Sequence, residues 1–142
     1  MIYFDASYVA RFYLEDPGWE KVHELAVHSP VACCIHGRAE VISAIHRKLR
    51  EGVFTLLQYG QVLEQFEIDC GVNAYRWLPL SLTVTERLSK AFRALPKTIF
   101  LRASDAVHLA CAAENSFNEI YSNDQTLLSA ASHFGLKGVN VI

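Results

Sequence analysis

The chain has 142 residues, 51% of them hydrophobic and 20% charged, a balance that excludes a disordered protein and indicates one globular domain over residues 1–142. No apolar run is long enough to cross a bilayer, and no basic leader precedes the opening residues, so we expect a cytoplasmic protein without a membrane segment. The net charge of −2 excludes a general attraction to nucleic acid, so a polyanionic partner would have to meet a local basic patch or a metal ion.

Apolar periodicity divides the chain into alternating strands and helices. In chain order we expect a strand over 1–5, helices over 6–14 and 19–28, a strand over 31–35, helices over 38–50 and 55–69, a short strand within 75–80, helices over 83–95 and 101–114, a strand over 119–122, a helix over 126–134 and a last strand over 139–142. The helix over 55–69 is expected to contribute five residues to the core, namely Leu56, Leu57, Tyr59, Leu63 and Phe66.

Strand-like runs separated by helices predict an α/β fold, because parallel strands need helical crossovers. We expect a three-layer sandwich with a mainly parallel central sheet flanked by helices. In such sheets, ligands bind outside the carboxyl ends of the strands. Asp5 and Asp124 directly follow strands, so both are expected at that edge.

The segment LRASDAVHLACAAE, residues 101–114, is small and apolar on nearly every side. Its three polar exceptions, Arg102, Asp105 and His108, are spaced three apart and share one helix face. Burying an unpaired carboxylate costs several kcal/mol or forces its protonation. Asp105 must therefore meet a helix N-terminus, a cation such as Arg102, or a bound metal ion.

Four acids, Asp5, Glu40, Asp105 and Asp124, are each placed at a strand end or near the start of a helix. If they gather at one sheet edge, their mutual repulsion calls for a hard divalent cation such as Mg²⁺ or Mn²⁺. Such an ion would support hydrolysis of a phosphodiester bond. The four cysteines lack paired spacing, which argues against a thiolate zinc site and indicates small buried hydrophobic residues.

Each of these residues also has an ordinary structural interpretation. Asp5 and Asp124 are suitable helix N-caps, Asp105 suits the first turn of a helix, and Glu40 suits an exposed edge. An interior histidine such as His108 is more often hydrogen-bonded than a metal ligand. The nearby serines, Ser7 and Ser122, are either local backbone caps or groups that hold a carboxylate or a metal-bound water.

Four segments, MIYFDAS, RAEVISAIHRK, LRASDAVHLA and YSNDQTLL, occur in this order along nearly the whole chain. They resemble the four acidic motifs of the PIN-domain ribonucleases, specifically the VapC-type toxins of toxin–antitoxin pairs. LRASDAVHLA, with Pro96 before it, is the most specific of them. One departure is Ala6, where many relatives carry a hydroxyl residue, and it puts the fine positioning of the first Asp in question.

The resemblance implies a PIN-like fold in which the four acids bind Mg²⁺ or Mn²⁺ and Ser7 and Ser122 support them. It further implies an endoribonuclease toxin that cuts transfer or ribosomal RNA, forms a homodimer and is inhibited by a cognate antitoxin. A possible antitoxin surface comprises four aromatic residues, Tyr8, Phe12, Tyr13 and Trp19, with core packing as the alternative for at least half of them. Candidates for phosphate or antitoxin contacts are the basic residues Arg11, Arg38, Arg47, Lys48 and Arg102.

Two other classes of function stay open. One is a catalytically inactive PIN-like module that uses the acid pocket or the aromatic face only to bind a partner. The other is a receiver-type signalling domain, which also places Asp residues and Mg²⁺ at strand ends. A receiver would need a Lys at a late strand end, and residues 119–122 contain none.

Overall fold

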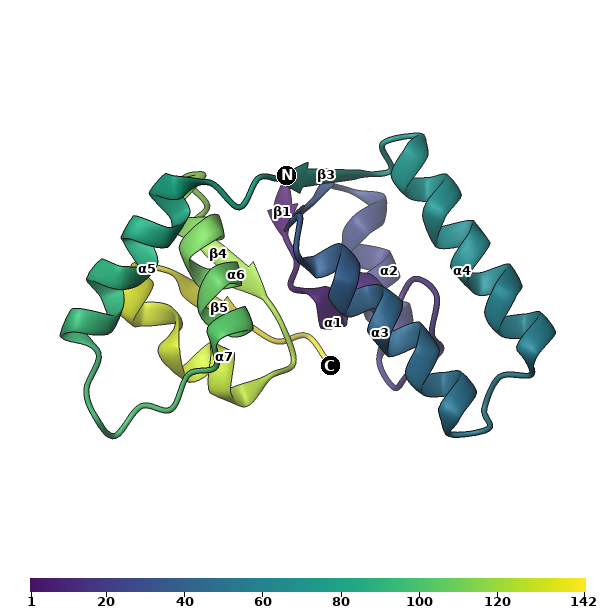
Figure 1. Ribbon diagram of the computed structural model, residues 1–142. Helices are drawn as coiled ribbons and strands as arrows, with labels where there is room; N and C mark the ends of the chain where they lie inside the picture. Colours follow the sequence, from purple (N-terminus) through teal and green to yellow (C-terminus); the bar gives the residue numbers. More distant parts are fainter.

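The structure is a computed structural model that describes all residues from 1 to 142 (Figure 1). None of its helices has the length and apolar character needed to cross a lipid bilayer. Its elements in chain order are β1 (Ile2–Tyr3), α1 (Ala6–Ala10), α2 (Trp19–Val27), β2 (Val31–Cys34), α3 (Gly37–Arg50), α4 (Leu56–Gly71), β3 (Tyr75–Leu78), α5 (Leu82–Ala94), α6 (Ala103–Glu114), β4 (Glu119–Tyr121), α7 (Gln125–Ala130), the 3₁₀ helix η1 (Ala131–Phe134) and β5 (Lys137–Val139).

All strand pairs are parallel. Strand β1 pairs with β2, and β2 pairs with β3, while β4 pairs with β5. A parallel bridge between Phe4 and Tyr121 joins the two groups, and the Asp5 N–H donates to the Tyr121 carbonyl at 3.1 Å. The strands therefore follow the spatial order β3-β2-β1-β4-β5, which confirms the predicted parallel sheet flanked by helices.

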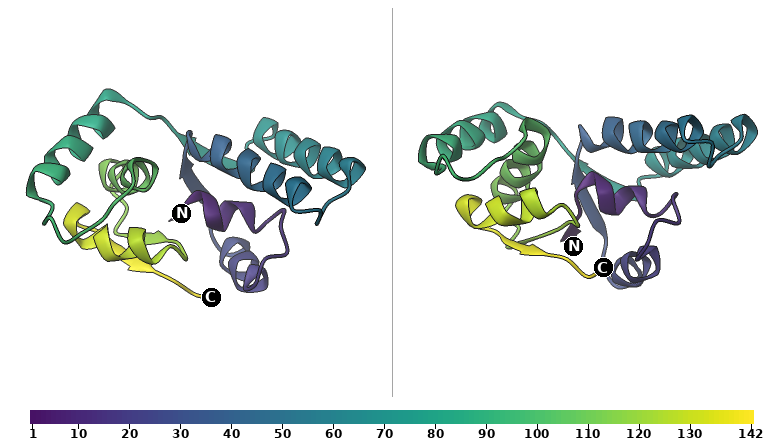
Figure 2. Two further views of the ribbon diagram at one scale, coloured as in Figure 1. Left: turned by 60° about the horizontal axis from the view of Figure 1, so that its bottom comes forward. Right: turned by 90° about the horizontal axis from the view of Figure 1, so that it is seen from below.

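Neighbouring residues in the strands face opposite cores, as the two-residue repeat of a strand requires. Tyr3 and Cys34 point into one core, which also includes residues of α5, α6 and α7. Phe4 and Cys33 point into the other core, built mainly from α1, α2, α3 and α4. Figure 2 shows these two helical layers on either side of the strands, with α3 and α4 extending side by side.

The four cysteines are free and buried, which confirms their interpretation as core residues. The core prediction for α4 is wrong for Leu56 and Leu57, which are 73% and 72% exposed, whereas Phe66 is buried and Tyr59 packs against the core. Both leucines lie in the first turn of α4, and α4 packs mainly against α3. Periodicity places residues on a helix face, but it does not say how much of that face a neighbour covers.

Two predicted bounds at the chain ends also differ from the structure. The helix expected over 6–14 ends at Ala10, and turns continue to the buried Leu14. The last strand covers Lys137–Val139 instead of 139–142. Gly138 lies inside this strand, and a Cβ atom there would come within 3.2 Å of the Leu128 backbone. The absent side chain is what lets α7 lie this close to β5.

Gly37 begins α3 at an equally tight position and yields a prediction about stability. A Cβ atom at Gly37 would lie 2.6 Å from Cys33 Sγ and 3.3 Å from His108 Cε1. Overpacking of this kind costs about 1–3 kcal/mol, so Gly37→Ala is expected to lower the free energy of unfolding by that amount in urea denaturation. Gly60→Ala, in α4 with nothing within 4 Å, is the control and should raise it by up to about 1 kcal/mol. Equal effects of the two substitutions would contradict this assignment.

Candidate metal centre

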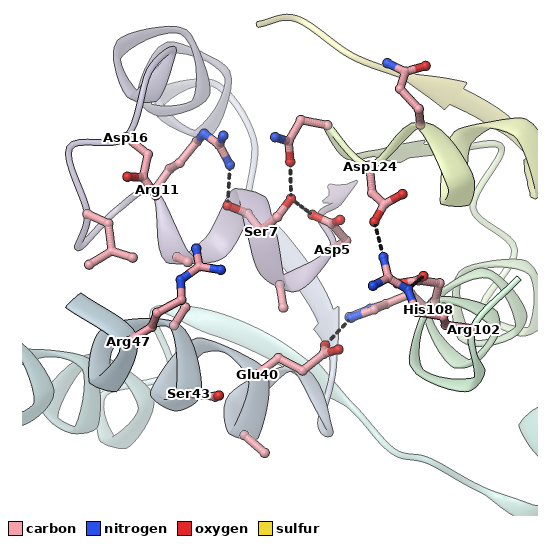
Figure 3. A pocket seen from close by; sticks show the side chains of 18 of the residues that line it. Asp5, Ser7, Arg11, Asp16, Glu40, Ser43, Arg47, Arg102, His108 and Asp124 are labelled. Carbon is pink, nitrogen blue, oxygen red and sulfur yellow. Dashed lines mark hydrogen bonds and ion pairs between the residues drawn. The ribbon is translucent and has the colours of Figure 1, made fainter. Parts of the chain in front are cut away.

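A cavity of about 970 Å³ opens at the carboxyl ends of β1 and β4 (Figure 3). Four acids from remote parts of the chain line it. Asp5 follows β1, Glu40 lies in the first turn of α3, Asp105 lies in the first turn of α6, and Asp124 follows β4. The structure thus brings all four predicted acids to one cavity, because parallel strands and their following helices present their functional ends at the same edge.

Asp5 is buried and held by three donors. Its Oδ1 accepts from Ser7 Oγ at 2.7 Å and from the Tyr8 N–H at 3.0 Å, and its Oδ2 accepts from Ser122 Oγ. Burial raises the pKa of Asp5, and these hydrogen bonds together with nearby His108 oppose the rise. Asp5 is therefore both the N-cap of α1 and an oriented carboxylate in the cavity.

Glu40 is positioned by a histidine on the facing helix. Its Oε2 lies 2.7 Å from His108 Nε2 and 3.5 Å from His36 Nε2. Burial by itself raises the pKa of Glu40, but the hydrogen bond from His108 and the neighbouring imidazoles hold it below the ordinary value. Glu40 is consequently ionised near neutral pH and available as a ligand.

Arg102 bridges the remaining two acids. Its guanidinium contacts Asp105 at 3.2 Å and Asp124 at 2.8 Å, while its side chain stays 59% exposed. The pKa of Asp105 is raised by burial and by the charge of Asp124, and Arg102 offsets part of this rise. Asp124 also caps α7 by accepting from the Thr126 and Leu127 N–H groups. Asp105 in the first turn of α6 and Asp124 at the N-cap of α7 therefore stabilise the starts of their helices and also line the cavity.

The serines predicted as supporting residues contact the acids. Ser122 is fully buried, donates to Asp5, and accepts the Asp124 N–H at 2.9 Å, so a single hydroxyl links two of the four acids. Ser7 Oγ also lies 2.8 Å from the side-chain oxygen of Asn123, which sequence reasoning did not single out. His36 was likewise missed, although its position four residues before Glu40 would have placed it on the same helix face.

Removing the Ser122 hydroxyl should be costly. Ser122→Ala deprives the buried Asp5 carboxylate of a donor and leaves the Asp124 N–H without its acceptor. Leaving such groups unsatisfied costs about 1–3 kcal/mol, which is the expected fall in unfolding free energy by urea denaturation. Ser129→Ala, which removes an exposed hydroxyl bonded to the Gln125 carbonyl, should change it by less than about 0.5 kcal/mol. A similar loss for both variants would count against the Ser122 assignment.

The donor set fits a hard divalent cation. Carboxylate oxygens are the ligands that Mg²⁺ and Mn²⁺ prefer. The pKa of Asp105 is raised by burial and, second, by the charge of Asp124, and a bound cation would oppose both effects. His36, Glu40 and His108 form a second grouping whose ligand atoms lie within 4.8 Å of one another. However, His36 Nε2 lies 3.2 Å from the Ser104 carbonyl and His108 Nε2 lies 2.7 Å from Glu40, so these nitrogens already act as donors. The carboxylates are therefore the better ligands.

The predicted basic and aromatic residues differ in their surroundings. Arg47 and Arg102 line the cavity, while Arg11 is buried and donates to the Ser7 and Pro17 carbonyls. Lys48 pairs with Asp16, and Arg38 stacks over the Trp77 ring, 5.9 Å from its centroid. Among the four aromatic residues, Tyr8 is fully buried and is excluded from an antitoxin surface, and Phe12 and Tyr13 pack against the same core, in agreement with the core-packing alternative.

Comparisons with known proteins agree with this architecture. FitAcB from Neisseria gonorrhoeae has a TM-score of 0.77 at 18% identity, with 99% of this chain and 97% of that chain covered. VapBC2 from Rickettsia felis, solved with a promoter DNA fragment, has a TM-score of 0.69 at 14% identity over 100% of both chains. VapC20 from Mycobacterium tuberculosis, a sarcin-ricin loop cleaving toxin, has a TM-score of 0.69 at 15% identity, with 96% and 99% covered.

At these identities the solved structures establish a shared fold, and a search among curated proteins gives no match. A comparison with family models aligns residues 2–132 with the PIN domain. This match includes all four acids of the cavity and more than half of the chain. The chain therefore belongs to the PIN domain family.

Proposed function

We propose that this chain, as a single domain over residues 1–142, is a metal-dependent endoribonuclease toxin that hydrolyses phosphodiester bonds in transfer or ribosomal RNA. The observation that carries the proposal is the convergence of four carboxylates, from segments far apart in the sequence, on one open cavity. Membership of the PIN family supports a nuclease activity, since PIN domains are typically metal-dependent nucleases.

Asp5, Glu40, Asp105 and Asp124 are the residues that would hold Mg²⁺ or Mn²⁺. When bound, the ion supplies an activated water and neutralises charge on the phosphate. The protein's own contribution is orientation. Ser7 and Ser122 fix the Asp5 carboxylate, and His108 holds Glu40, so that these acids need little rearrangement when an ion binds. Arg47 lines the same cavity and supplies a positive charge suited to a neighbouring RNA phosphate.

Partners are proposed from the same comparisons. The similar solved structures include FitAB bound to a DNA fragment and VapBC2 from Rickettsia felis bound to a fragment of its promoter. We infer that this chain forms a homodimer and is held inactive by a cognate antitoxin. Phe12, Tyr13 and Trp19 remain candidates for the antitoxin surface, and Arg102 remains a candidate for pairing with an antitoxin acid or an RNA phosphate.

The test is to incubate the purified protein with total RNA, with and without Mn²⁺, and to map the new 5′ ends. Discrete cleavage positions that disappear with chelator are the expected result. Uniform degradation that chelator does not affect would indicate a contaminating nuclease and would not support the proposal. Cleavage concentrated in transfer RNA or ribosomal RNA loops would identify the substrate class, since loops offer unstacked bases.

A second candidate function is a PIN-like binding module without turnover. Arg102 favours it, because its guanidinium already neutralises Asp105 and Asp124 without a metal ion. This candidate predicts Mn²⁺ binding by calorimetry with no new RNA ends from any RNA pool. Arg102→Gln would then change metal affinity without producing cleavage.

A further inference from the structure

Tyr3 lies at the end of β1 and is completely buried beneath the acid cavity. Its hydroxyl group lies 3.1 Å from the Cys34 backbone nitrogen and 3.0 Å from His108 Nδ1. The ring is held from the side by Phe117, in a T-shaped contact with centroids 5.4 Å apart. A single hydroxyl therefore connects β1, the end of β2 and the middle of α6.

The direction of these hydrogen bonds follows from the chemistry of the partners. The Cys34 N–H can only donate, so the Tyr3 oxygen accepts from it. A tyrosine phenol keeps its proton near neutral pH, so the Tyr3 hydroxyl has one proton of its own to donate. The other hydrogen-bond partner of this hydroxyl is His108 Nδ1, an atom that can accept, and the Tyr3 proton is therefore directed to it.

The other ring nitrogen of His108 faces Glu40. A carboxylate only accepts hydrogen bonds, so the 2.7 Å contact between His108 Nε2 and Glu40 Oε2 requires a proton on Nε2. The contact with Tyr3 at Nδ1 and the contact with Glu40 at Nε2 each indicate where the imidazole proton lies, and both place it on Nε2. The chain of donors runs from the Cys34 N–H to Tyr3, from Tyr3 to His108, and from His108 to Glu40.

We propose that Tyr3 is a positioning residue that fixes His108 in its Nε2–H form, so that His108 orients Glu40 and does not itself bind metal. The other neutral form would direct the Nε2 lone pair at the carboxylate and push Glu40 out of place. This inference rests on the proposed function for its catalytic meaning, while the hydrogen-bond assignment can be tested in the metal-free protein.

The primary experiment is ¹⁵N NMR of the metal-free full chain labelled at its histidines. The chain has six histidines, and the His108 signals are identified by their loss in His108→Gln. We expect a pyridine-like shift for His108 Nδ1 and a pyrrole-like shift for Nε2. In Tyr3→Phe, which removes only the hydroxyl, the Nε2–H form should fall from nearly the whole population to a mixture with the Nδ1–H or doubly protonated form.

A second readout is the affinity for Mn²⁺, measured by calorimetry. Removing a group that orients a metal ligand typically costs 10–100-fold in affinity, and Tyr3 acts one step further away, so Tyr3→Phe should raise the Mn²⁺ Kd by roughly threefold to tenfold. The matched control is Tyr75→Phe, another buried tyrosine whose hydroxyl bonds to Tyr13 at 2.7 Å. The control should leave both the His108 signals and the Kd within about twofold of the original protein.

Three results would overturn the assignment. These are a pyrrole-like Nδ1 in the original protein, a doubly protonated His108 there, or an unchanged His108 population in Tyr3→Phe. The first two need no variant, so the inference stays falsifiable even if Tyr3→Phe fails to fold. A protein that shows the expected NMR pattern but cuts no RNA would contradict the nuclease proposal alone.

Discussion

Glu40→Gln is expected to reduce metal-dependent RNA cleavage about a thousandfold, which corresponds to roughly 4 kcal/mol of transition-state stabilisation. The substitution replaces a charged oxygen by a neutral amide in the cavity where the four acids are proposed to hold a divalent ion. The amide oxygen can still accept from His108 Nε2, so the hydrogen bond that is 2.7 Å long with Glu40 can still form. The measurement is the single-turnover rate on a mapped RNA site at saturating Mn²⁺.

Two controls accompany this measurement. Glu119→Gln removes a carboxylate at the start of β4, which pairs with Lys137 at 2.9 Å, and it should cleave at nearly the original rate. Unfolding of Glu40→Gln in urea should show a loss of less than about 1.5 kcal/mol, because the hydrogen bond loses charge but not its acceptor. Undiminished cleavage by a folded Glu40→Gln protein would remove this residue from the proposed metal site.

The second large effect concerns stability. We expect Mn²⁺ to bind the folded chain and not the unfolded chain. At a concentration about 100 times its Kd, it should then add about 2.7 kcal/mol to the free energy of unfolding and raise Tm by roughly 10 °C. Asp105→Asn should abolish most of this increase, because it removes the charge of a proposed ligand in the first turn of α6. The measurement is thermal unfolding with Mn²⁺ and with chelator. A Tm increase that Asp105→Asn leaves intact would place the ion elsewhere.

The stability of the metal-free protein also has a defined dependence on pH. The pKa values of Asp5 and Asp105 are raised in the folded protein, chiefly by burial. The stability that these raised values contribute is fully present below the ordinary pKa of the groups and is lost as pH rises through their folded-state pKa values. Without metal, Asp105→Asn should therefore be at least as stable as the original protein near neutral pH and lose this advantage in acid.

Metal binding responds to pH in the opposite direction. The ion needs both carboxylates ionised, so the increase in Tm caused by Mn²⁺ should shrink as pH falls from neutral towards about 5. As pH falls, these acids become protonated at a higher pH than exposed acids do, because their pKa values are raised. An increase in Tm that is the same at both pH values would contradict the participation of Asp5 and Asp105.

The sequence determined the local elements and the chemical types of the site. Alternation of strand and helix patterns predicted a parallel sheet, and the order β3-β2-β1-β4-β5 agrees with that prediction. Asp5 and Asp124 were placed at strand ends, and both cap the helices that follow. These features depend on residues close in sequence, whose periodicity and capping chemistry are local.

Only the tertiary structure decided which groups meet. The contact of Tyr3 with His108 spans 105 positions, and that of Ser122 with Asp5 spans 117, so no local pattern encodes either pair. The exposure of Leu56 was likewise set by how little of α4 its neighbours cover. Periodicity fixes the direction of a side chain relative to its own helix or strand, whereas its partners depend on how those elements pack across the sheet.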